Sequence, residues 1–312
     1  MAKILVTGAA GFIGSHTADQ LLAAGHRVWG VDNLRTGRRE NVAAAVRAGL
    51  SLRVFDLLDQ PRFDRLVRQI RPDAIVHLAA LVSVVESFRC PDLNFRLNVE
   101  ATFRVAEAAR RHGVPRLVFA SSAAVYGDAR QLPVAETSPA APISPNGAAK
   151  LASEQLLLAY AGAYGLTVRI QRYFNVFGPR QDPASPYSGV VSIFADRLGR
   201  GLPITIFGDG RQSRDFVPVA EVARANLLAA TKARVQTGVA NICTGRPISL
   251  LHLVRILGRR VGAPQPRFAA ARPGEIRHSA GSTRAARREL GFKARAGVAR
   301  SLAALVDPMP SP

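Results

Sequence analysis

The chain has 312 residues, of which 48% are hydrophobic and 21% charged, the balance of a soluble globular protein with a substantial core. No apolar stretch is long enough to cross a bilayer, because Asp, Arg or His interrupts each one. The net charge of +20 would favour nucleic acid as a partner, but only four of the 42 basic residues are lysines and the arginines are spread along the chain. This skew is typical of GC-rich coding sequence. We therefore expect no nucleic-acid binding, and attraction of a diphosphate ligand is the better explanation of the positive charge.

Strand and helix patterns alternate through the first half of the chain. A short apolar and β-branched run over 3–7 leads into a glycine turn and a helix over 15–24, which Gly25 closes. Further strands are predicted over 27–32, 52–56, 74–80, 116–122 and 167–173, and further helices over 61–70, about 93–112 and about 147–164. This alternation predicts a doubly wound parallel sheet, a Rossmann-type α/β fold with right-handed crossovers.

The alternation of strand and helix patterns ends after Asn175. Six prolines between 179 and 247 break the chain into short pieces, although helices are still predicted over 219–233 and 249–261. We therefore expect a dinucleotide-binding domain over 1–174, rejoined by about 215–243. The remainder, 175–312, is expected to be mainly a smaller α/β lobe that binds the substrate.

Other sequence features narrow the class of protein further. The chain runs at once into a strand and a glycine turn, without room for a cleaved signal, so we expect a cytoplasmic protein. The two cysteines, Cys90 and Cys243, are too few for a disulfide framework, and the six histidines form no HxxxH or HxH pair. We expect no metal site.

The glycine turn has the features of a dinucleotide site. In the segment TGAAGFIG, Gly8 permits a tight turn, Gly11 lets the backbone approach a phosphate, and Gly14 allows the helix to pack closely on the strand. Asp32 ends the second predicted strand, where a carboxylate accepts hydrogen bonds from the adenosine ribose and repels a 2′-phosphate. The sequence therefore predicts NAD rather than NADP as the cofactor.

The spacing of these glycines is the pattern of the short-chain dehydrogenase/reductase superfamily. The chain resembles its extended branch, the NAD-dependent epimerase/dehydratase family, and within it the UDP-glucose 4-epimerase-like proteins. The resemblance extends over nearly the whole chain. It is carried by eight blocks: TGAAGFIG at 7–14, VDNL at 31–34, HLAA at 77–80, SSAAVYG at 121–127, SPNGAAK at 144–150, RYFNVFGPRQDP at 172–183, GDGRQSRDF at 208–216 and RPGEIRHS at 272–279.

The resemblance implies contacts with NAD and a homodimer. Besides the three glycines and Asp32, the implied NAD-binding residues are Phe12, Ile13, Asn33, Asp56, Leu57, Ala79, Ala80, Asn98, Lys150 and Tyr173. Similar proteins dimerise by packing two helices per subunit, here about 93–112 and 147–164, and we expect the same arrangement.

In similar enzymes a serine or threonine, a tyrosine and a lysine act together. Ser122 ends a predicted strand at the carboxyl edge of the sheet, and Lys150 lies one turn beyond position 146 on the same helix face. By resemblance, the lysine depresses the pKa of a phenol at 146, which takes the proton of the sugar C4 hydroxyl while that carbon is oxidised. This chain carries Asn146 there, and an amide cannot ionise near neutral pH. The resemblance thus implies a UDP-hexose 4-epimerase that is impaired at its proton acceptor.

Several interpretations of this change stay open. The asparagine is a natural change that alters the chemistry, a natural change that inactivates the enzyme, or an introduced substitution. Tyr126 is the nearest other phenol in the sequence, and its takeover of the role is a weak alternative. A protein that binds NAD and nucleotide sugar without turnover is the main rival. An oxidoreductase that releases a 4-keto sugar, and a dehydratase, rank lower; Ala123 and Ala124 stand where dehydratases carry acidic residues.

The resemblance also assigns the substrate contacts. The amide of Asn175 and the guanidinium groups of Arg214 and Arg272 are expected to hold the diphosphate, since arginine forks suit phosphate better than lysine does. Thr205, Ile206 and Phe207 correspond to the strand that cradles uracil. Ser279 stands beside the sugar, and its small side chain leaves room for a C2 acetamido group, so UDP-GlcNAc and UDP-GalNAc are expected to fit as well as UDP-Glc and UDP-Gal. Further implied contacts are Ser83, Ser122 and Val190.

Overall fold

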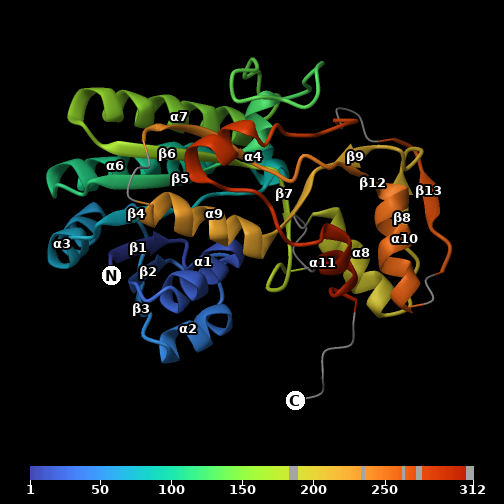
Figure 1. The fold of residues 1–312 in the computed structure, drawn as a ribbon, viewed down its shortest axis with the longest axis horizontal. Coiled ribbons are helices and arrows are strands. Elements are labelled where there is room, and N and C mark those ends of the chain that lie inside the picture. Colours follow the sequence, from blue (N-terminus) through green and yellow to red (C-terminus); the bar gives the residue numbers. More distant parts are fainter. Residues whose placement is uncertain (183–188, 233–235, 262–263, 272–275, 307–312) are drawn as a thin grey trace.

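The computed structural model describes residues 1–182, 189–232, 236–261, 264–271 and 276–306. At the centre lies a sheet of seven parallel strands in the order β11-β6-β5-β4-β1-β2-β3 (Figure 1). The strands are β1 (Lys3–Thr7), β2 (Arg27–Asp32), β3 (Ser51–Val54), β4 (Ala74–His77), β5 (Arg116–Ser122), β6 (Thr167–Tyr173) and β11 (Gly238–Ile242). This is the predicted doubly wound sheet. Its strand order reverses between β1 and β4, which is where such folds bind dinucleotides.

Most predicted strands have the predicted bounds. Those of β1, β2, β5 and β6 are confirmed, whereas β4 was expected over 74–80 and ends at His77. Leu78 N still donates to Thr7 O at 3.2 Å and shares its hydrogen with Thr7 Oγ1 at 3.2 Å, whereas Ala79 N turns to Thr7 Oγ1 alone, at 3.3 Å. Similarly, β3 ends before Asp56, whose Oδ1 accepts a turn hydrogen bond from Leu58 N at 2.9 Å.

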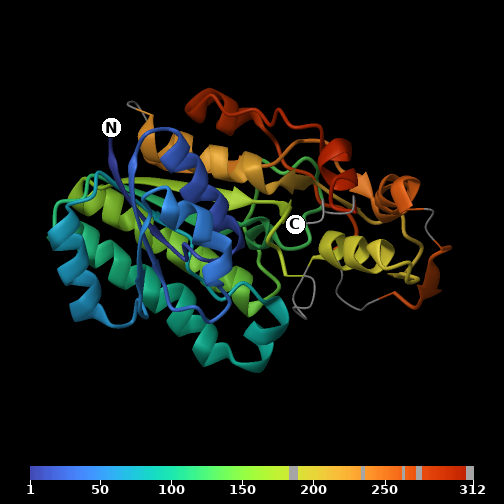
Figure 2. The same cartoon turned by 90° about the horizontal axis from the view of Figure 1, so that it is seen from below.

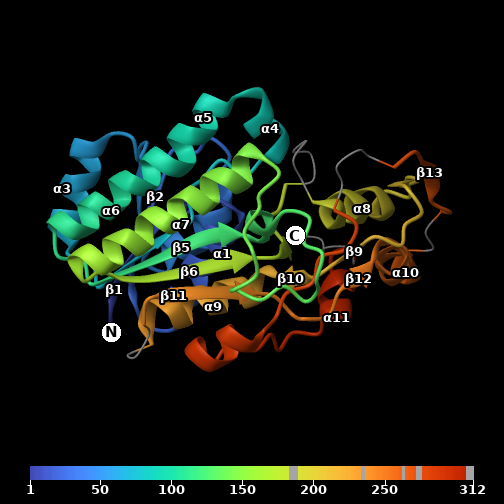
Figure 3. The same ribbon diagram turned by 90° about the horizontal axis from the view of Figure 1, so that it is seen from above.

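Helices cover both faces of the sheet. On one face lie α1 (Phe12–Ala23) and α9 (Val219–Thr231); on the other lie α3 (Gln60–Ile70), α6 (Ala101–Arg111) and α7 (Pro145–Tyr164). A separate buried apolar cluster lies under each helix layer. Figure 3 shows α6 and α7 side by side across the sheet, where they also contact each other. Burial of both sheet faces explains why the strands are almost wholly apolar.

The helix predicted over about 93–112 is one continuous run with an irregular middle. It consists of α5 (Pro91–Phe95), a π-helical turn η2 (Arg96–Glu100) and α6. Within the π turn, Asn98 accepts from Leu81 N at 3.1 Å through Oδ1 and donates to Leu81 O at 3.0 Å through Nδ2. Such turns are frequent at functional sites. Here the turn fixes the loop that follows β4.

The C-terminal part lies beside the sheet, at the right in Figures 1 and 2. Its helices α8 (Val190–Gly199), α10 (Leu250–Val261) and α11 (Val298–Ala303) contribute to a third apolar cluster. Three short strand pairs join it: β7 (Asn175–Phe177) with β10 (Phe216–Pro218), β9 (Ser213–Arg214) with β12 (Ile248–Ser249), and β8 (Thr205–Phe207) with β13 (Arg267–Ala269). The short helices η1 (Arg39–Val42), α2 (Ala43–Arg47), α4 (Val84–Arg89), η3 (Ala123–Tyr126) and η4 (Ala286–Leu290) were not predicted. Although β11 and α9 belong to the sheet layers, the functional division into two parts remains a prediction.

Candidate active site

The turn between β1 and α1 has room for backbone only. Gly8 has φ +68°, in the left-handed region, and a methyl group on it would lie 2.8 Å from Ala79 N. A methyl group on Gly14 would lie 1.9 Å from Gly8 O. At the start of α1, Gly11 is the N-cap and supplies no side-chain hydrogen bond, and no acidic residue stands in the first turn. The helix N-terminus is therefore open to an anionic group, which fits the pyrophosphate of a dinucleotide.

Asp32 lies next to this turn at the end of β2. Its Oδ2 accepts from Ala10 N at 2.9 Å and its Oδ1 from Leu34 N at 2.8 Å. Burial raises the pKa of the Asp32 carboxyl, and these backbone hydrogen bonds oppose that rise. Each oxygen of a carboxylate can accept more than one hydrogen bond, so Asp32 keeps the capacity to accept from hydroxyl groups of a ligand. The neighbouring Asn33 donates from Nδ2 to Asp56 Oδ2 at 2.9 Å, which brings two further predicted cofactor residues together.

A buried hydrogen-bonded chain supports the loop after β4, which carries Ala79 and Ala80. Thr7 Oγ1 lies 2.7 Å from His77 Nδ1, and His77 Nε2 lies 3.1 Å from Thr102 Oγ1. Burial lowers the pKa of His77 to about 3, and the nearby Lys150 charge adds to that effect. His77 is therefore a neutral structural group at physiological pH, and it positions the loop without titrating.

Ser122 ends β5, and the side chain of Lys150 reaches the same end of that strand at Ala120. Ser122 Oγ accepts from Ala124 N at 3.1 Å and so begins the η3 turn. Lys150, on α7, is buried; its Nζ donates to Ala120 O at 2.8 Å and lies 4.9 Å from the centre of the Phe119 ring. Burial lowers the pKa of Lys150 to about 8, although the Glu154 carboxylate one turn further along α7 opposes the shift.

Asn146 is 4% exposed in the first turn of α7. Its Nδ2 donates to Leu81 O at 2.7 Å, and its backbone N donates to Ser87 Oγ at 3.2 Å. Within the described ranges its amide thus bonds the loop after β4, and not Ser122 or Lys150. The position predicted for a phenol holds a neutral group with a structural contact of its own.

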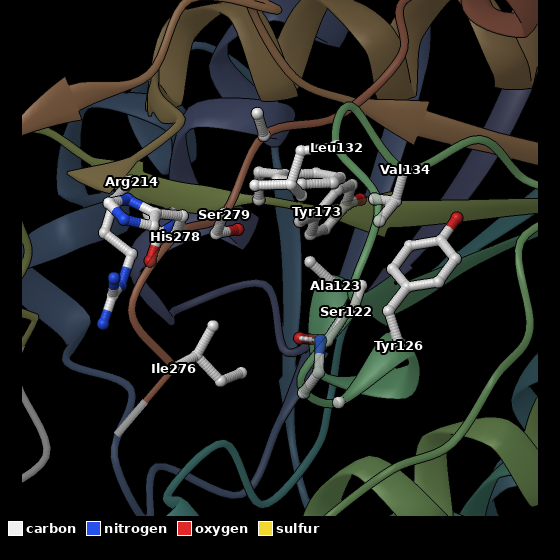
Figure 4. A pocket seen from close by; sticks show the side chains of 16 residues that line it. Ser122, Ala123, Tyr126, Leu132, Val134, Tyr173, Arg214, Ile276, His278 and Ser279 are labelled. Atoms are coloured by element: carbon white, nitrogen blue, oxygen red, sulfur yellow. Dashed lines mark hydrogen bonds between the residues drawn. The ribbon is translucent and has the colours of Figure 1, made fainter. Parts of the chain in front are cut away.

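Tyr126 does not occupy the place of the missing phenol. Its hydroxyl donates to Asn241 Oδ1 at 2.7 Å, and the guanidinium of Arg172 lies 4.7 Å from the ring centre. In Figure 4 the hydroxyl points away from Ser122. Because burial also raises the pKa of the Tyr126 phenol, this geometry argues against its use as the proton acceptor.

A cavity of about 220 Å³ lies beside Ser122, between the ends of β5 and β6 and the segment 276–280 (Figure 4). It brings together the predicted residues Ser122, Tyr173, Asn175, Arg214 and Ser279. Wall residues that were not predicted as site residues are Ala123, Ala124, Tyr126, Gly127, Ala129, Leu132, Val134, Phe174, Ile276, His278 and Ala280. Most of the unpredicted wall is apolar. His278 could have been found from the RPGEIRHS block, whereas Leu132 and Val134 lie in an irregular segment without a periodic pattern.

The other predicted substrate residues lie outside this wall. Thr205 is exposed and Phe207 half-buried in β8, and Val190 begins α8. Ser83 is buried, and its Oγ accepts from Glu86 N at 2.9 Å as the N-cap of α4. Arg272 lies outside the described residues.

Comparison with known proteins agrees with this geometry. Residues 4–243 match the model of the NAD dependent epimerase/dehydratase family. A UDP-glucose 4-epimerase of Mycolicibacterium smegmatis is 39% identical over 308 residues, which are 98% of this chain and 97% of the relative. The chain belongs to the NAD dependent epimerase/dehydratase family. This membership confirms the predicted resemblance, the nucleotide-sugar epimerase scaffold and NAD as the cofactor of that scaffold.

Two solved members of the family superpose over almost the whole chain. The UDP-glucose 4-epimerase of Thermotoga maritima with UDP-glucose has a TM-score of 0.92 at 37% identity, covering 98% of this chain and 97% of that one. The UDP-N-acetylglucosamine 4-epimerase of Methanobrevibacter ruminantium, in complex with UDP-N-acetylmuramic acid, has a TM-score of 0.92 at 34% identity with the same coverage.

Two further findings concern metals and membranes. In the described part of this family member, no three His, Cys, Asp or Glu side chains lie together as a metal site would require. None of the described helices is long and apolar enough to cross a membrane.

Proposed function

We propose that this chain is an NAD-dependent 4-epimerase of a UDP-hexose whose turnover is reduced by Asn146. The observation that carries the proposal is the cavity beside Ser122, which brings together Ser122, Tyr173, Asn175, Arg214 and Ser279 in a chain of this family. The test is interconversion of UDP-glucose and UDP-galactose, and of their N-acetyl counterparts, by this chain and by its Asn146→Tyr variant.

The residues present fit NAD and assign a task to each part of the site. When bound, NAD supplies the reversible oxidation of the sugar carbon. Backbone N–H groups in the first turn of α1 would hold its pyrophosphate, and Asp32 its adenosine ribose. The Ser122 hydroxyl would orient the C4 hydroxyl of the sugar, and Lys150 would supply a positive charge near the reacting oxygen. Asn146 can orient a hydroxyl but cannot take its proton.

A protein that binds both ligands without turnover is the second candidate. Its support is that Asn146 is well accommodated, with hydrogen bonds from both its side chain and its backbone. Such a protein would bind NAD and a UDP-sugar while producing no epimer. An oxidoreductase that releases its keto product would instead accumulate NADH in proportion to the sugar consumed. A dehydratase is disfavoured, because Ala123 and Ala124 offer the cavity no acid or base.

The cavity wall supports a substrate with a C2 acyl group. Ser279 is a half-buried, small side chain on that wall, and Leu132, which is 41% exposed, lines the same cavity (Figure 4). We expect Ser279→Tyr to weaken binding of UDP-GlcNAc by about tenfold or more, since a tyrosine would occupy the space of the acetamido group and overpacking costs about 1–3 kcal/mol. Isothermal titration with UDP-GlcNAc and UDP-glucose measures this. Ser279→Ala is the control, and equal affinity of the tyrosine variant for UDP-GlcNAc would contradict the assignment.

We also propose a homodimer formed through the outer faces of α5, α6 and α7. Phe95, Phe103 and Tyr164 are 57%, 43% and 55% exposed on these adjacent helices, and large apolar side chains left exposed in this way favour a partner. Sedimentation should give twice the chain mass of 33.4 kDa. Replacement of Phe95 and Phe103 by glutamate should give the monomer with its helical content unchanged. A monomeric unaltered chain would refute the dimer.

A further inference from the structure

Asp215 is a buried carboxylate that does not line the cavity. It lies between β9 and β10 and is 0% exposed. Its Oδ1 accepts from Thr244 N at 2.8 Å and from Thr244 Oγ1 at 2.6 Å, and its Oδ2 accepts from Gly245 N at 2.8 Å and from Gly281 N at 3.4 Å. Burial raises the pKa of Asp215, and these four hydrogen bonds oppose the rise. Neutral donors alone hold this carboxylate, because none of the ion pairs found among the described residues includes it.

The groups that Asp215 holds are neighbours of the cavity wall. Its carbonyl oxygen accepts from Asn175 N at 3.1 Å and from Asn175 Nδ2 at 3.4 Å. Gly281 directly follows the wall residues Ser279 and Ala280, and Arg214 directly precedes Asp215. Asp215 therefore links chain segments that are far apart in the sequence, and two of them, at Asn175 and at 279–280, supply residues to the cavity wall.

The same segments have little freedom to rearrange. A methyl group on Gly281 would lie 2.6 Å from Phe174 Cζ and 2.7 Å from Cys243 Sγ, so the backbone passes here in close contact with its neighbours. Arg214 Nη1 donates to Arg277 O at 3.2 Å, which ties the direction of its guanidinium to the segment that Asp215 holds at Gly281. A shift of this segment would therefore move Arg214 and Ser279 together.

We propose that Asp215 is a positioning residue for the diphosphate side of the site, setting the spacing between Asn175, Arg214 and the segment 279–281. The inference rests on the proposed function, because it presupposes a nucleotide diphosphate in this cavity. A carboxylate is required since donors approach both of its oxygens. An asparagine would present its Nδ2 hydrogens either to Thr244 or to the N–H groups of Gly245 and Gly281, and one side would lose its acceptor.

The test compares the affinities for UDP and NAD in variants of the full chain by isothermal titration, together with the Tm of each. Asp215→Asn should weaken UDP binding by about tenfold or more and change the Kd of NAD by less than about twofold, because hydrogen bonds to a charged group are among the stronger ones. Thr244→Val keeps the three backbone donors and removes the hydroxyl, so it should weaken UDP binding by about threefold. In the Asn146→Tyr background, Asp215→Asn should raise KM for the UDP-sugar much more than it lowers kcat.

Glu221→Gln is the matched control. Glu221 is a buried carboxylate that accepts from Arg295 N at 3.0 Å and Ala296 N at 2.9 Å and pairs with Arg224, and it is absent from the cavity wall. Its replacement should lower the Tm without changing either affinity. If Asp215→Asn and Thr244→Val bind UDP as the unaltered chain does, or lose UDP and NAD in equal proportion, the positioning role is wrong while the proposed function stands. Absence of UDP binding in the unaltered chain would overturn both.

Discussion

Replacing Asn146 by tyrosine is expected to raise the rate of UDP-glucose and UDP-galactose interconversion by about 10² to 10⁴-fold, the usual contribution of general acid–base catalysis. The variant regains an ionisable group one helical turn from Lys150, whose positive charge favours the phenolate. Loss of the amide hydrogen bond should cost the fold little. Although the hydrogen bond from Asn146 Nδ2 to Leu81 O is lost, that carbonyl still accepts from Asn98 Nδ2 at 3.0 Å. Initial rates of the two chains at saturating NAD measure the effect.

Asn146→Phe is the control for this prediction. Phenylalanine fills nearly the same volume as tyrosine but offers no hydroxyl, so it should be as slow as the unaltered chain. Equal activity of the asparagine and tyrosine forms would mean that another group takes the proton, and the assignment of position 146 would then be wrong. If neither form turns over while both bind NAD and a UDP-sugar, the binding-protein candidate gains support.

The parts of the fold that sequence could predict are those with local signals. The strands β1, β2, β5 and β6 are short apolar runs bounded by turns, so their limits are visible in the sequence. The predicted end of β4 was wrong because the true end depends on a hydrogen bond between residues far apart in the sequence, from Ala79 N to Thr7 Oγ1. The π turn of Arg96–Glu100 was missed for a different reason, since five residues inside a continuous helix are too few to show a period of their own.

In the candidate site, too, residues with local sequence signals were predicted and those placed by long-range contacts were missed. Its predicted members lie in recognisable blocks, and the cavity brings Ser122, Asn175, Arg214 and Ser279 onto one wall. The apolar wall residue Val134 was missed because long-range contacts alone place it: its N–H donates to Ala280 O at 2.9 Å, and its carbonyl accepts from Ser282 N at 2.8 Å. The secondary-structure propensity of residues 132–134 does not predict these hydrogen bonds.

The hydrogen-bond partner of the Asn146 side chain could not be predicted from the sequence either. The substitution could be read as a missing phenol, but only the arrangement of α7 against the loop after β4 reveals that its amide donates to Leu81 O. Likewise the SRDF block draws attention to Arg214 as a ligand-binding residue, whereas the surroundings of Asp215 depend on Thr244, Gly245 and Gly281, all brought to it by the fold.

Gly14→Ala is expected to weaken NAD binding by about 100-fold, equivalent to roughly 2.7 kcal/mol. The added methyl group would lie 1.9 Å from Gly8 O and 2.9 Å from Ala9 Cα. Both are backbone atoms and cannot rotate away, so α1 must move from β1 and carry its N-terminal N–H groups away from the pyrophosphate. Overpacking of this kind also costs about 1–3 kcal/mol of folding stability. Titration with NAD and thermal unfolding measure the two effects separately.

Gly162→Ala provides the matched control, since Gly162 is a helical glycine of α7 with no atom within 4 Å of an added methyl group. This exchange should stabilise the chain by about 0.5–1 kcal/mol and leave the Kd of NAD unchanged. The Kd of UDP reports whether the Gly14 variant is still folded, because the diphosphate residues belong to the other side of the site. A Gly14→Ala chain that binds UDP and also retains full NAD affinity would show that the pyrophosphate lies elsewhere, and the glycine turn would then be an ordinary strand–helix joint.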